Sequence, residues 1–258
     1  MLASLDPTLV ILVNMFTKKV NSTEGKAERP TERRRGRPQG TTSQGHQARQ
    51  RLYDTAIRMI GERGYEATTM RDIADAAGVS VGLLYRYFPS KRAVVLTLYD
   101  RLSAEFASRA ADLKSGKWRV RFVIALRICL EVLGPHRTTL CALRPVLLGD
   151  RDESLFAVDT AFSRRRVEGI FVDVVVKATD SPRSKLAEPL GRLLYVLHLA
   201  VILWWLFDKS SGQRATVALV ALLDRILPMF SVALMLPQVQ TCVRSADSLV
   251  REALLDNP

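Results

Sequence analysis

Three side chains that can donate hydrogen bonds to a polyanion stand close together near residue 88. Tyr85 and Tyr87 each carry a hydroxyl on a rigid ring, and Lys91 carries a compact ammonium at an expected helix start. Such groups, together with the free N–H groups of helix N-termini, bind the phosphates of nucleic acid. The two tyrosines could instead be core aromatics, but Leu84 and Phe88 already occupy the buried positions of this segment. We therefore expect the segment to face a phosphate backbone.

Two short helices joined by a tight turn are expected to hold these side chains. Thr69 has the position of an N-cap, with Asp72 three residues later as in a capping box, and Gly78 ends the helix. Ser80 then caps a second helix, Val81 to Phe88. A turn of about three residues is helix-turn-helix spacing, which lets the second helix lie in a major groove about 12 Å wide.

The stretch from Arg51 to Leu98 resembles the DNA-binding domain of the TetR-type (TetR/AcrR) transcriptional regulators. It reads RLYDTAIRMIGERGYEATTMRDIADAAGVSVGLLYRYFPSKRAVVLTL. The resemblance is carried by matches at fixed spacing, namely the Gly64 turn, Thr68-Thr69, Arg71-Asp72-Ile73-Ala74, Ala77-Gly78-Val79-Ser80 and Leu84-Tyr85-x-Tyr87-Phe88-x-x-Lys91. It covers only the beginning of the folded chain.

The resemblance implies a repressor that binds a palindromic operator as a dimer and leaves it when a small molecule occupies the larger C-terminal domain. It also implies two groups of DNA contacts. Base edges would be approached by Val81, Gly82 and Leu83, and phosphates would be held by Thr68 or Thr69, Tyr85, Tyr87 and Lys91. Leu83 departs from the family, which often has threonine there, so apolar contact with a thymine methyl is the remaining option.

Residues 1–45 are expected to form a flexible basic arm, because the sequence from Thr17 to about Gly45 is polar and basic, with glycines and prolines and no apolar periodicity. Arg35 and Arg37 flank a glycine in an Arg-Gly-Arg-Pro motif, which can lie in the narrow minor groove of A·T-rich DNA. A solvated tail that adds only salt-sensitive, non-specific affinity is the alternative. If the arm dominated binding, the protein would be an architectural coat rather than a repressor.

The apolar run Leu9 to Phe16 near the N-terminus is interrupted by Asn14 and lacks a cleavage motif, so we expect no signal peptide. A start at Met15 would explain the run equally well. Lysine and arginine number 38 against 26 aspartates and glutamates, a formal charge of +12. This excess favours a polyanionic partner, either nucleic acid or an anionic membrane.

Residue patterns give no support to chemistry other than binding. No Gly-rich phosphate loop or His-Glu-x-x-His motif occurs, so we expect no enzyme, no catalytic residue and no cofactor. Three scattered histidines do not form a metal site by local spacing. Cys129, Cys141 and Cys242 fit neither a disulfide framework nor a Cys-x-x-Cys site, which favours a cytoplasmic, nucleoid-associated protein. Redox sensing is an alternative, although apolar neighbours favour inert burial of Cys129.

Apolar residues at helical spacing run through nearly every segment from Gln47 onward, which predicts an all-α fold. We expect a first helix from about Gln47 to Glu62 and three parts to the chain. These are the arm (1–45), an N-terminal three-helix helix-turn-helix DNA-binding domain (46–92) and an all-helical ligand-binding and dimerisation domain (93–258).

Two long apolar segments near the C-terminus are expected to form the dimer interface. Leu193 to Phe207 is interrupted only by His198, and a helix apolar all round must be buried on every side. The second, Thr216 to about Leu236, is expected to kink at Pro228. Two such helices from each subunit would form a four-helix bundle across a two-fold axis, giving a homodimer.

A transmembrane hairpin is the competing interpretation of these segments. The first is short for a span, and Asp224 and Arg225 sit midway in the second. Each charge would cost about 2.5–3.5 kcal/mol at a bilayer centre. We therefore expect no membrane association.

A cavity for a small-molecule effector is expected among the helices from about Trp118 to Trp205. The candidate contacts, each of which could equally be ordinary packing, are Phe122, His136, Phe162, His198 and Trp204. His198 is the best candidate for a polar contact because it is alone on an apolar helix. A hydrogen-bonded core or interface histidine is its alternative role.

Overall fold

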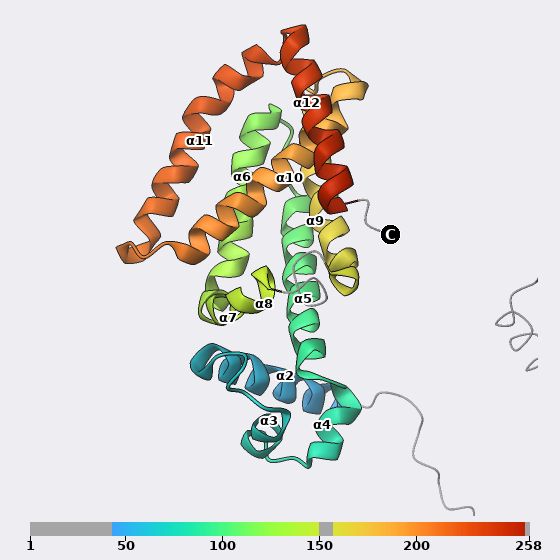
Figure 1. The fold of residues 1–258 in the computed structure, drawn as a ribbon, viewed down its shortest axis with the longest axis vertical. Coiled ribbons are helices and arrows are strands. Elements are labelled where there is room, and N and C mark those ends of the chain that lie inside the picture. The colour runs from blue at the N-terminus through green and yellow to red at the C-terminus, as the bar shows by residue number, and fades with distance from the viewer. Residues whose placement is uncertain (1–42, 150–156, 256–258) are drawn as a thin grey trace, which may run out of the picture. The chain divides into compact units, whose positions relative to one another are not determined.

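The structure is a computed structural model, and it describes residues 43–149 and 157–255. These residues form helices, turns and short connections without a strand (Figure 1). The predicted all-α class is thus confirmed. Arg35 and Arg37, with the rest of the expected minor-groove motif, lie outside the described residues.

The head of the described chain consists of α2 (Ser43–Arg63), α3 (Met70–Ala76) and α4 (Val81–Tyr87). Helix α2 begins earlier than the predicted Gln47, so that Gly45 lies in the helix rather than in the arm. Apolar periodicity misses this first turn because it is built from polar residues, several of which are good helix formers. Fully buried side chains from all three helices form the core of the head: Ala56, Ile60, Ile73, Ala74 and Leu84.

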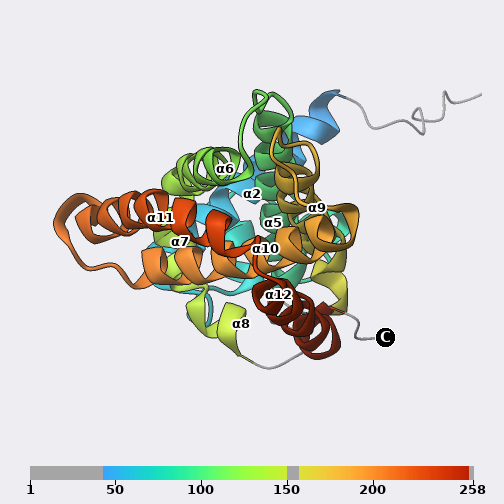
Figure 2. The same cartoon turned by 90° about the horizontal axis from the view of Figure 1, so that it is seen from above.

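Helix α5 (Lys91–Ala111) leads from the head into the body. The other body helices are α6 (Trp118–Leu133), α7 (Arg137–Ala142), α8 (Arg144–Leu148), α9 (Ala161–Val176), α10 (Ser184–Phe207), α11 (Arg214–Ala233) and α12 (Pro237–Val250). Helix α9 packs against α5, α6 and α10, while α12 packs on α10 and α11 on α6 (Figures 1 and 2).

Helix α10 is longer than the apolar segment that predicted it. It begins at Ser184 and continues through Pro189, well before Leu193. Helix α11 likewise continues past Pro228 to Ala233. By length and composition alone, both are apolar enough to cross a membrane. Their inner faces are used for packing, with Val201 and Trp205 of α10 buried in the body.

Helix α11 is buried on one side only within the single chain, and its predicted burial in a dimer stays a prediction. Val220, Leu223 and Leu227 face inward, but Val217 and Met229 are 67% and 73% exposed. The exposed large apolar side chains of α11 include Val217, Leu222, Ile226, Met229 and Val232, and those near the end of α10 are Leu203, Trp204 and Phe207. We call this set the α10–α11 face. The single chain packs against only one side of α11, as the buried side chains of Val220, Leu223 and Leu227 show.

The turn between α10 and α11 is organised by the carboxylate of Asp208. One of its oxygens accepts hydrogen bonds from the Ser210 backbone N–H at 2.8 Å and hydroxyl at 2.6 Å. The other accepts from the Thr216 backbone N–H at 2.9 Å and hydroxyl at 2.6 Å. These bonds favour the charged carboxylate, and they hold the pKa of Asp208 well below its ordinary value. This role of Asp208 was not predicted from the sequence.

The stability of the fold should therefore depend on the charge of Asp208 in acid. A depressed carboxyl pKa contributes stability that is present above the unfolded pKa of about 3.9 and is lost as pH falls towards the folded pKa. At pH 7 we expect Asp208→Asn to unfold at a lower urea concentration than the wild type. The difference between the two unfolding midpoints should become smaller between about pH 4 and pH 2. Asp112→Asn, at an exposed site, is the control. A gap that stays constant over this pH range would contradict the role given to the carboxylate.

Candidate nucleic-acid interface and effector cavity

The caps predicted for the helix-turn-helix are present. The Thr69 hydroxyl accepts from the Asp72 backbone N–H at 3.1 Å, and the Asp72 carboxylate accepts from the Thr69 backbone N–H at 3.0 Å. Hydrogen bonds from Thr69 also hold the pKa of Asp72 below its ordinary value. The Ser80 hydroxyl accepts from Leu83 N–H at 3.2 Å, and Gly78 takes the positive φ that ends α3. Local side-chain chemistry thus fixes both ends of the turn.

Helix α4 has one buried and one open face. Leu84 is fully buried, as is Phe88 just beyond the helix. On the open face, Tyr85 is 48% exposed, and a side chain at Gly82 would meet nothing within 4 Å. The three other positions expected to contact DNA are half-buried: Val81, Leu83 and Tyr87. Gly82 and Tyr85 are therefore the most accessible of the α4 positions in question.

Thr68 is wrongly placed among the candidate DNA contacts, because its side chain is fully buried. Its hydroxyl donates to the Gly64 carbonyl at 2.8 Å and lies 3.3 Å from the Met59 carbonyl. It thereby closes the turn after α2, where Gly64 has a φ of 91°. Thr69 is exposed and keeps its place as a candidate. Two adjacent threonines look alike in the sequence, and only the packing decides which one points inward.

The ammonium of Lys91 is held by the protein itself rather than free at the surface. Its Nζ donates to the carbonyls of Tyr65 and Thr68, the latter at 2.9 Å, and lies 4.1 Å from the centre of the Tyr65 ring. Two of its three N–H donors are thus directed at the loop before α3. The lysine fixes the loop that positions Thr69, and it has one donor left for a phosphate.

Exposed arginines surround the helix-turn-helix, and they were not among the predicted contacts. They are Arg49, Arg51, Arg63, Arg71 and Arg86. Arg49 also lies over the Phe88 ring, with 5.5 Å from its guanidinium carbon to the ring centre. Their positive charges give the head a surface suited to a polyanion. The overall basic composition was the available signal, but it does not say which arginines share a face.

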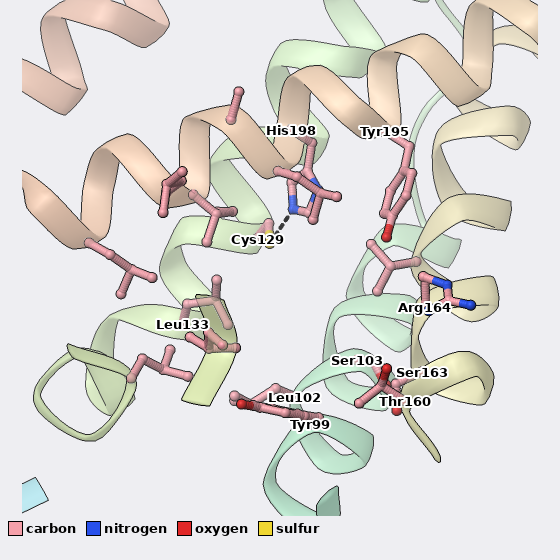
Figure 3. Close-up of a pocket in the computed structure, with 18 of the residues that line it drawn as sticks. Tyr99, Leu102, Ser103, Cys129, Leu133, Thr160, Ser163, Arg164, Tyr195 and His198 are labelled. Carbon is pink, nitrogen blue, oxygen red and sulfur yellow. Dashed lines mark hydrogen bonds between the residues drawn. The ribbon is translucent and has the colours of Figure 1, made fainter. Parts of the chain in front are cut away.

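The body contains a cavity of about 380 Å3, within the range of about 300–1,000 Å3 typical of small-molecule sites. Helices α5, α6, α9 and α10 contribute to its wall, which is mainly leucine and other apolar side chains (Figure 3). The polar side chains on the wall are Tyr99, Ser103, Cys129, Arg144, Thr160, Ser163, Arg164, Tyr195 and His198.

His198 lines the cavity, as expected, and its ring packs 4.6 Å from the Phe171 ring centre. Its Nε2 is 3.2 Å from Cys129 Sγ (Figure 3). Burial lowers the pKa of His198 to about 3 and raises that of the Cys129 thiol to about 12. Both groups are therefore neutral at physiological pH. A neutral thiol buried in this way is a poor nucleophile and redox sensor.

The four other predicted effector contacts do not line the cavity. Phe122 is part of the buried core, and His136 lies half-buried in the turn Gly134–His136. Phe162 is exposed beneath the Arg166 guanidinium, 4.5 Å from it, and Trp204 is exposed on the α10–α11 face. Aromatic residues at helical spacing do not reveal which of them face a cavity, because that depends on contacts between distant helices.

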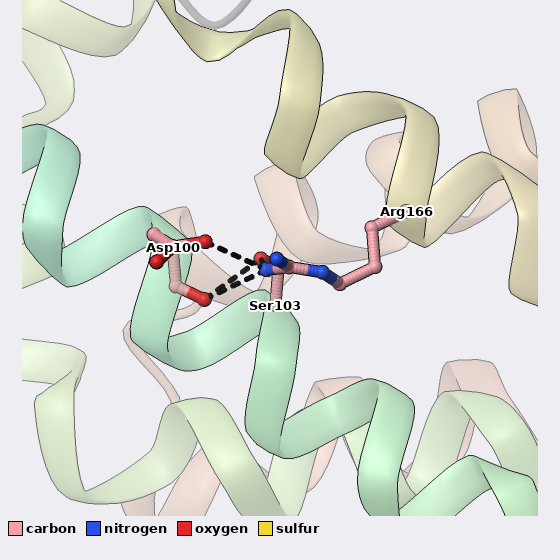
Figure 4. Close-up of polar contacts among 3 residues, drawn as sticks. All are labelled: Asp100, Ser103 and Arg166. Atoms are coloured by element: carbon pink, nitrogen blue, oxygen red, sulfur yellow. Dashed lines mark hydrogen bonds and ion pairs between the residues drawn. The ribbon is translucent and has the colours of Figure 1, made fainter.

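A polar contact joins the cavity wall to the helix that leads into the head. Arg166 of α9 donates to Asp100 of α5, at 2.8 Å to the carboxylate and 3.0 Å to the carbonyl (Figure 4). The same nitrogen lies 2.6 Å from the Ser103 hydroxyl, and Ser103 also lines the cavity. A change in the distance between α5 and α9 at the cavity would thus lengthen or break the hydrogen bonds of Arg166.

The body also contacts the head directly through α7. Thr139 of α7 donates its hydroxyl to the Ile57 carbonyl of α2 at 3.2 Å. A Cβ at Gly61 would stand only 2.9 Å from the Thr139 hydroxyl, so the approach of these helices requires glycine. The next residue of α7, Leu140, lines the cavity. Two adjacent residues therefore touch the head and the cavity.

Comparison with known proteins gives a specific match for the head. Residues 52–98 match the model of the bacterial regulatory proteins, tetR family. The transcriptional repressor KstR of Mycobacterium tuberculosis is 48% identical over 59 residues, which are 23% of this chain and 26% of KstR. The chain thus aligns with about a quarter of the length of this curated relative.

Solved structures extend the likeness to the body. A tetR-family transcriptional regulator from Streptomyces coelicolor is 20% identical with a TM-score of 0.56, covering 83% of this chain and 90% of its own. The fatty acid degradation regulator FadR from Bacillus halodurans is 18% identical with a TM-score of 0.55, covering 69% and 93%. At these identities the likeness concerns the fold: a helix-turn-helix head followed by a helical body.

Proposed function

We propose, from the membership of residues 52–98 in the tetR family of bacterial regulatory proteins, that this chain is a sequence-specific DNA-binding repressor of transcription. It acts in the cytoplasm, at the nucleoid, as a homodimer on a palindromic operator. A small molecule that occupies the cavity of the body releases it. It is a regulator rather than an enzyme, as is the repressor that matches its head.

The observation that carries this proposal is the two-sided build of α4. Leu84 fixes one face of the helix in the head, while Gly82 and Tyr85 lie on the other face. A helix of two turns that is capped at Ser80 and open on one side can lie in a major groove. Gly82 lets the helix come close to base edges, and Tyr85 offers a hydroxyl to a phosphate.

The dimer is supported by the α10–α11 face. Soluble monomers seldom leave large contiguous apolar patches open, and such patches mark interaction sites. Two copies of this face, related by a two-fold axis, would bury each other in a four-helix bundle. The same axis would present two α4 helices to successive turns of a palindromic operator. Arg35 and Arg37 would add contacts in the flanking minor groove.

Release by an effector is supported by the connections between the cavity and the head. Helix α5 lines the cavity with Tyr99 and Ser103 and then, at its other end, holds the head through Lys91. Helix α7 links Leu140 at the cavity to Thr139 against α2. A ligand that separates α5 from α9 would therefore tilt or rotate the head and change the spacing of the two α4 helices.

The proposal is tested by DNA binding of a variant that loses a single hydroxyl. Tyr85→Phe should lower the affinity for the DNA upstream of the protein's own gene about 5- to 30-fold, since a hydrogen bond to a charged group contributes about 1–2 kcal/mol or more. Fluorescence anisotropy at a fixed salt concentration, with competitor DNA, measures this. Tyr99→Phe, which removes a hydroxyl from the body, is the control. Equal affinities of Tyr85→Phe and wild type would remove Tyr85 from the interface.

A further inference from the structure

The wall of the cavity is built mainly from apolar side chains. They come from helices that lie far apart in the sequence, and they include Leu102, Phe106, Leu133, Val167, Leu199 and Ile202. Among the described residues, no aspartate or glutamate belongs to the wall. A molecule in this space is therefore surrounded largely by hydrocarbon, and its binding depends on what the few polar groups of the wall can still offer.

Two hydroxyl groups of the wall are already used within the protein. Ser103 donates to the Asp100 carbonyl at 3.0 Å and accepts from Arg166 at 2.6 Å (Figure 4). Thr160 donates to the Ala157 carbonyl at 2.7 Å. Each of these hydroxyls carries one proton, and that proton is directed at a backbone oxygen. Neither hydroxyl therefore has a donor left for a ligand.

The two arginines of the wall are engaged as well. Arg144 donates through Nε to the Cys141 carbonyl at 3.0 Å, and its guanidinium carbon lies 4.9 Å from the centre of the Phe207 ring. Arg164 has interaction partners within the protein, and it interacts electrostatically with the carboxylate of Glu168. Neither guanidinium is therefore an isolated charge that a ligand would have to match.

The other titratable groups of the wall are uncharged at physiological pH. Burial lowers the pKa of His198 to about 3 and raises that of the Cys129 thiol to about 12, and these two groups lie 3.2 Å apart. Burial also raises the pKa of the Tyr99 and Tyr195 phenols above the ordinary value. An ion that entered the cavity would thus lose its hydration without meeting an opposite charge that is still unmatched.

We propose that the effector is an uncharged, hydrocarbon-like molecule, which the cavity holds by apolar contacts rather than by an ion pair. The inference rests on the effector-controlled function proposed above and specifies the chemical class of the effector. Burial of apolar surface supplies the affinity, because it removes that surface from water without breaking a polar contact of the wall. A cavity of about 380 Å3 has room for a small ligand of this class.

The first test uses the wild-type chain and three ligands that share one ring system. At neutral pH naphthalene is uncharged, 2-naphthoate is an anion and 2-naphthylmethylammonium is a cation. Isothermal titration calorimetry should show that naphthalene binds at least about 10-fold more tightly than either ion, because only the ions lose favourable hydration in the cavity. Either ion binding as tightly as naphthalene, or no binding of naphthalene, would overturn the proposal.

The second test locates naphthalene by filling the cavity. Val167 of α9 is half-buried on the wall, whereas Val176 of the same helix is exposed and does not line the cavity. Val167→Trp should weaken naphthalene binding at least about 10-fold, and Val176→Trp should keep the wild-type affinity. Leu199→Trp, which fills the cavity from α10, takes the place of Val167→Trp if that variant does not fold. Unchanged affinity in the folded cavity variant, or an equal loss in Val176→Trp, would contradict the assigned site.

Operator binding with and without naphthalene separates this inference from the proposed function. Naphthalene should weaken a specific complex of the wild type with DNA about 5-fold or more, and binding without this effect would exclude it as an effector. Specific DNA binding together with an ion as the preferred ligand would overturn the hydrocarbon-like effector alone. A preference for naphthalene together with no specific DNA binding would instead overturn the repressor and leave the ligand class of the cavity standing.

Discussion

Leu222→Glu is expected to convert the proposed dimer into a monomer. Leu222 is exposed on the α10–α11 face, so the substitution should leave the single chain folded. In the dimer it would bury an unpaired carboxylate from each subunit, and one uncompensated buried charge costs about 3–5 kcal/mol. The dimer dissociation constant should therefore rise at least about 100-fold. Analytical ultracentrifugation with circular dichroism measures assembly and folding together.

Loss of the proposed dimer should also lower the affinity for the operator. Two linked heads gain about 10²- to 10⁴-fold in affinity over one, so Leu222→Glu should bind a palindromic site at least about 100-fold more weakly. Val158→Glu is the control, since Val158 is exposed in the turn before α9 and away from the α10–α11 face. A Leu222→Glu protein that stays dimeric and keeps its affinity would place the dimer contact elsewhere.

Adjacent leucines in α4 should respond to truncation in opposite ways. Leu84 is fully buried beneath the helix, so Leu84→Ala should lower the free energy of unfolding by about 2–5 kcal/mol. Leu83 is half-buried on the neighbouring face, so Leu83→Ala should lower the free energy of unfolding by about 1 kcal/mol or less. The same substitution should change the preference among operator bases, because the contact of Leu83 with a thymine methyl would be lost.

Urea unfolding followed by circular dichroism measures the first effect, and anisotropy with operators altered one base pair at a time measures the second. A large stability loss in Leu83→Ala with none in Leu84→Ala would mean that α4 is rotated about its axis. Loss of all DNA binding by Leu84→Ala under conditions where it is fully folded would place Leu84 in the interface.

Local chemistry made the head predictable from the sequence. The residues that shape the turns interact only with groups a few positions away, so their spacing in the sequence reveals them. They are the N-caps Thr69 and Ser80 and the turn glycines Gly64 and Gly78. The buried position of Leu84 follows from helical periodicity in the same way. These short-range features were sufficient to predict the helix-turn-helix, whereas of the three side chains expected to point outward only Tyr85 is exposed.

Long-range contacts account for most of what the sequence could not predict. Lys91 meets carbonyls of Tyr65 and Thr68, which lie far back along the chain, and no spacing rule connects them. The burial of Thr68 depends on the same loop. In the body, helices from α5 to α10 contribute to the wall of the cavity, and of the predicted effector contacts only His198 lines it.

Whether the outer side of α11 is buried depends on contacts that one chain does not supply. Periodicity shows how much of a helix is apolar, but it does not show whether the cover comes from the same chain or from another copy. Val217 and Met229 are exposed in the single chain, although α11 as a whole has the apolar composition of a buried helix. The dimer interface that this pattern predicts therefore stays a prediction, and within one chain α11 is buried on one side only.

The central claim is that two α4 helices in one dimer bind DNA in successive major grooves. Hydroxyl-radical footprinting of the purified protein on the DNA upstream of its own gene tests it most directly. We expect protection at an inverted repeat whose half-site centres lie about one duplex turn, 10 to 10.5 base pairs, or a multiple of that distance apart. Uniform, salt-sensitive protection without a repeat, or none above competitor DNA, would contradict the claim.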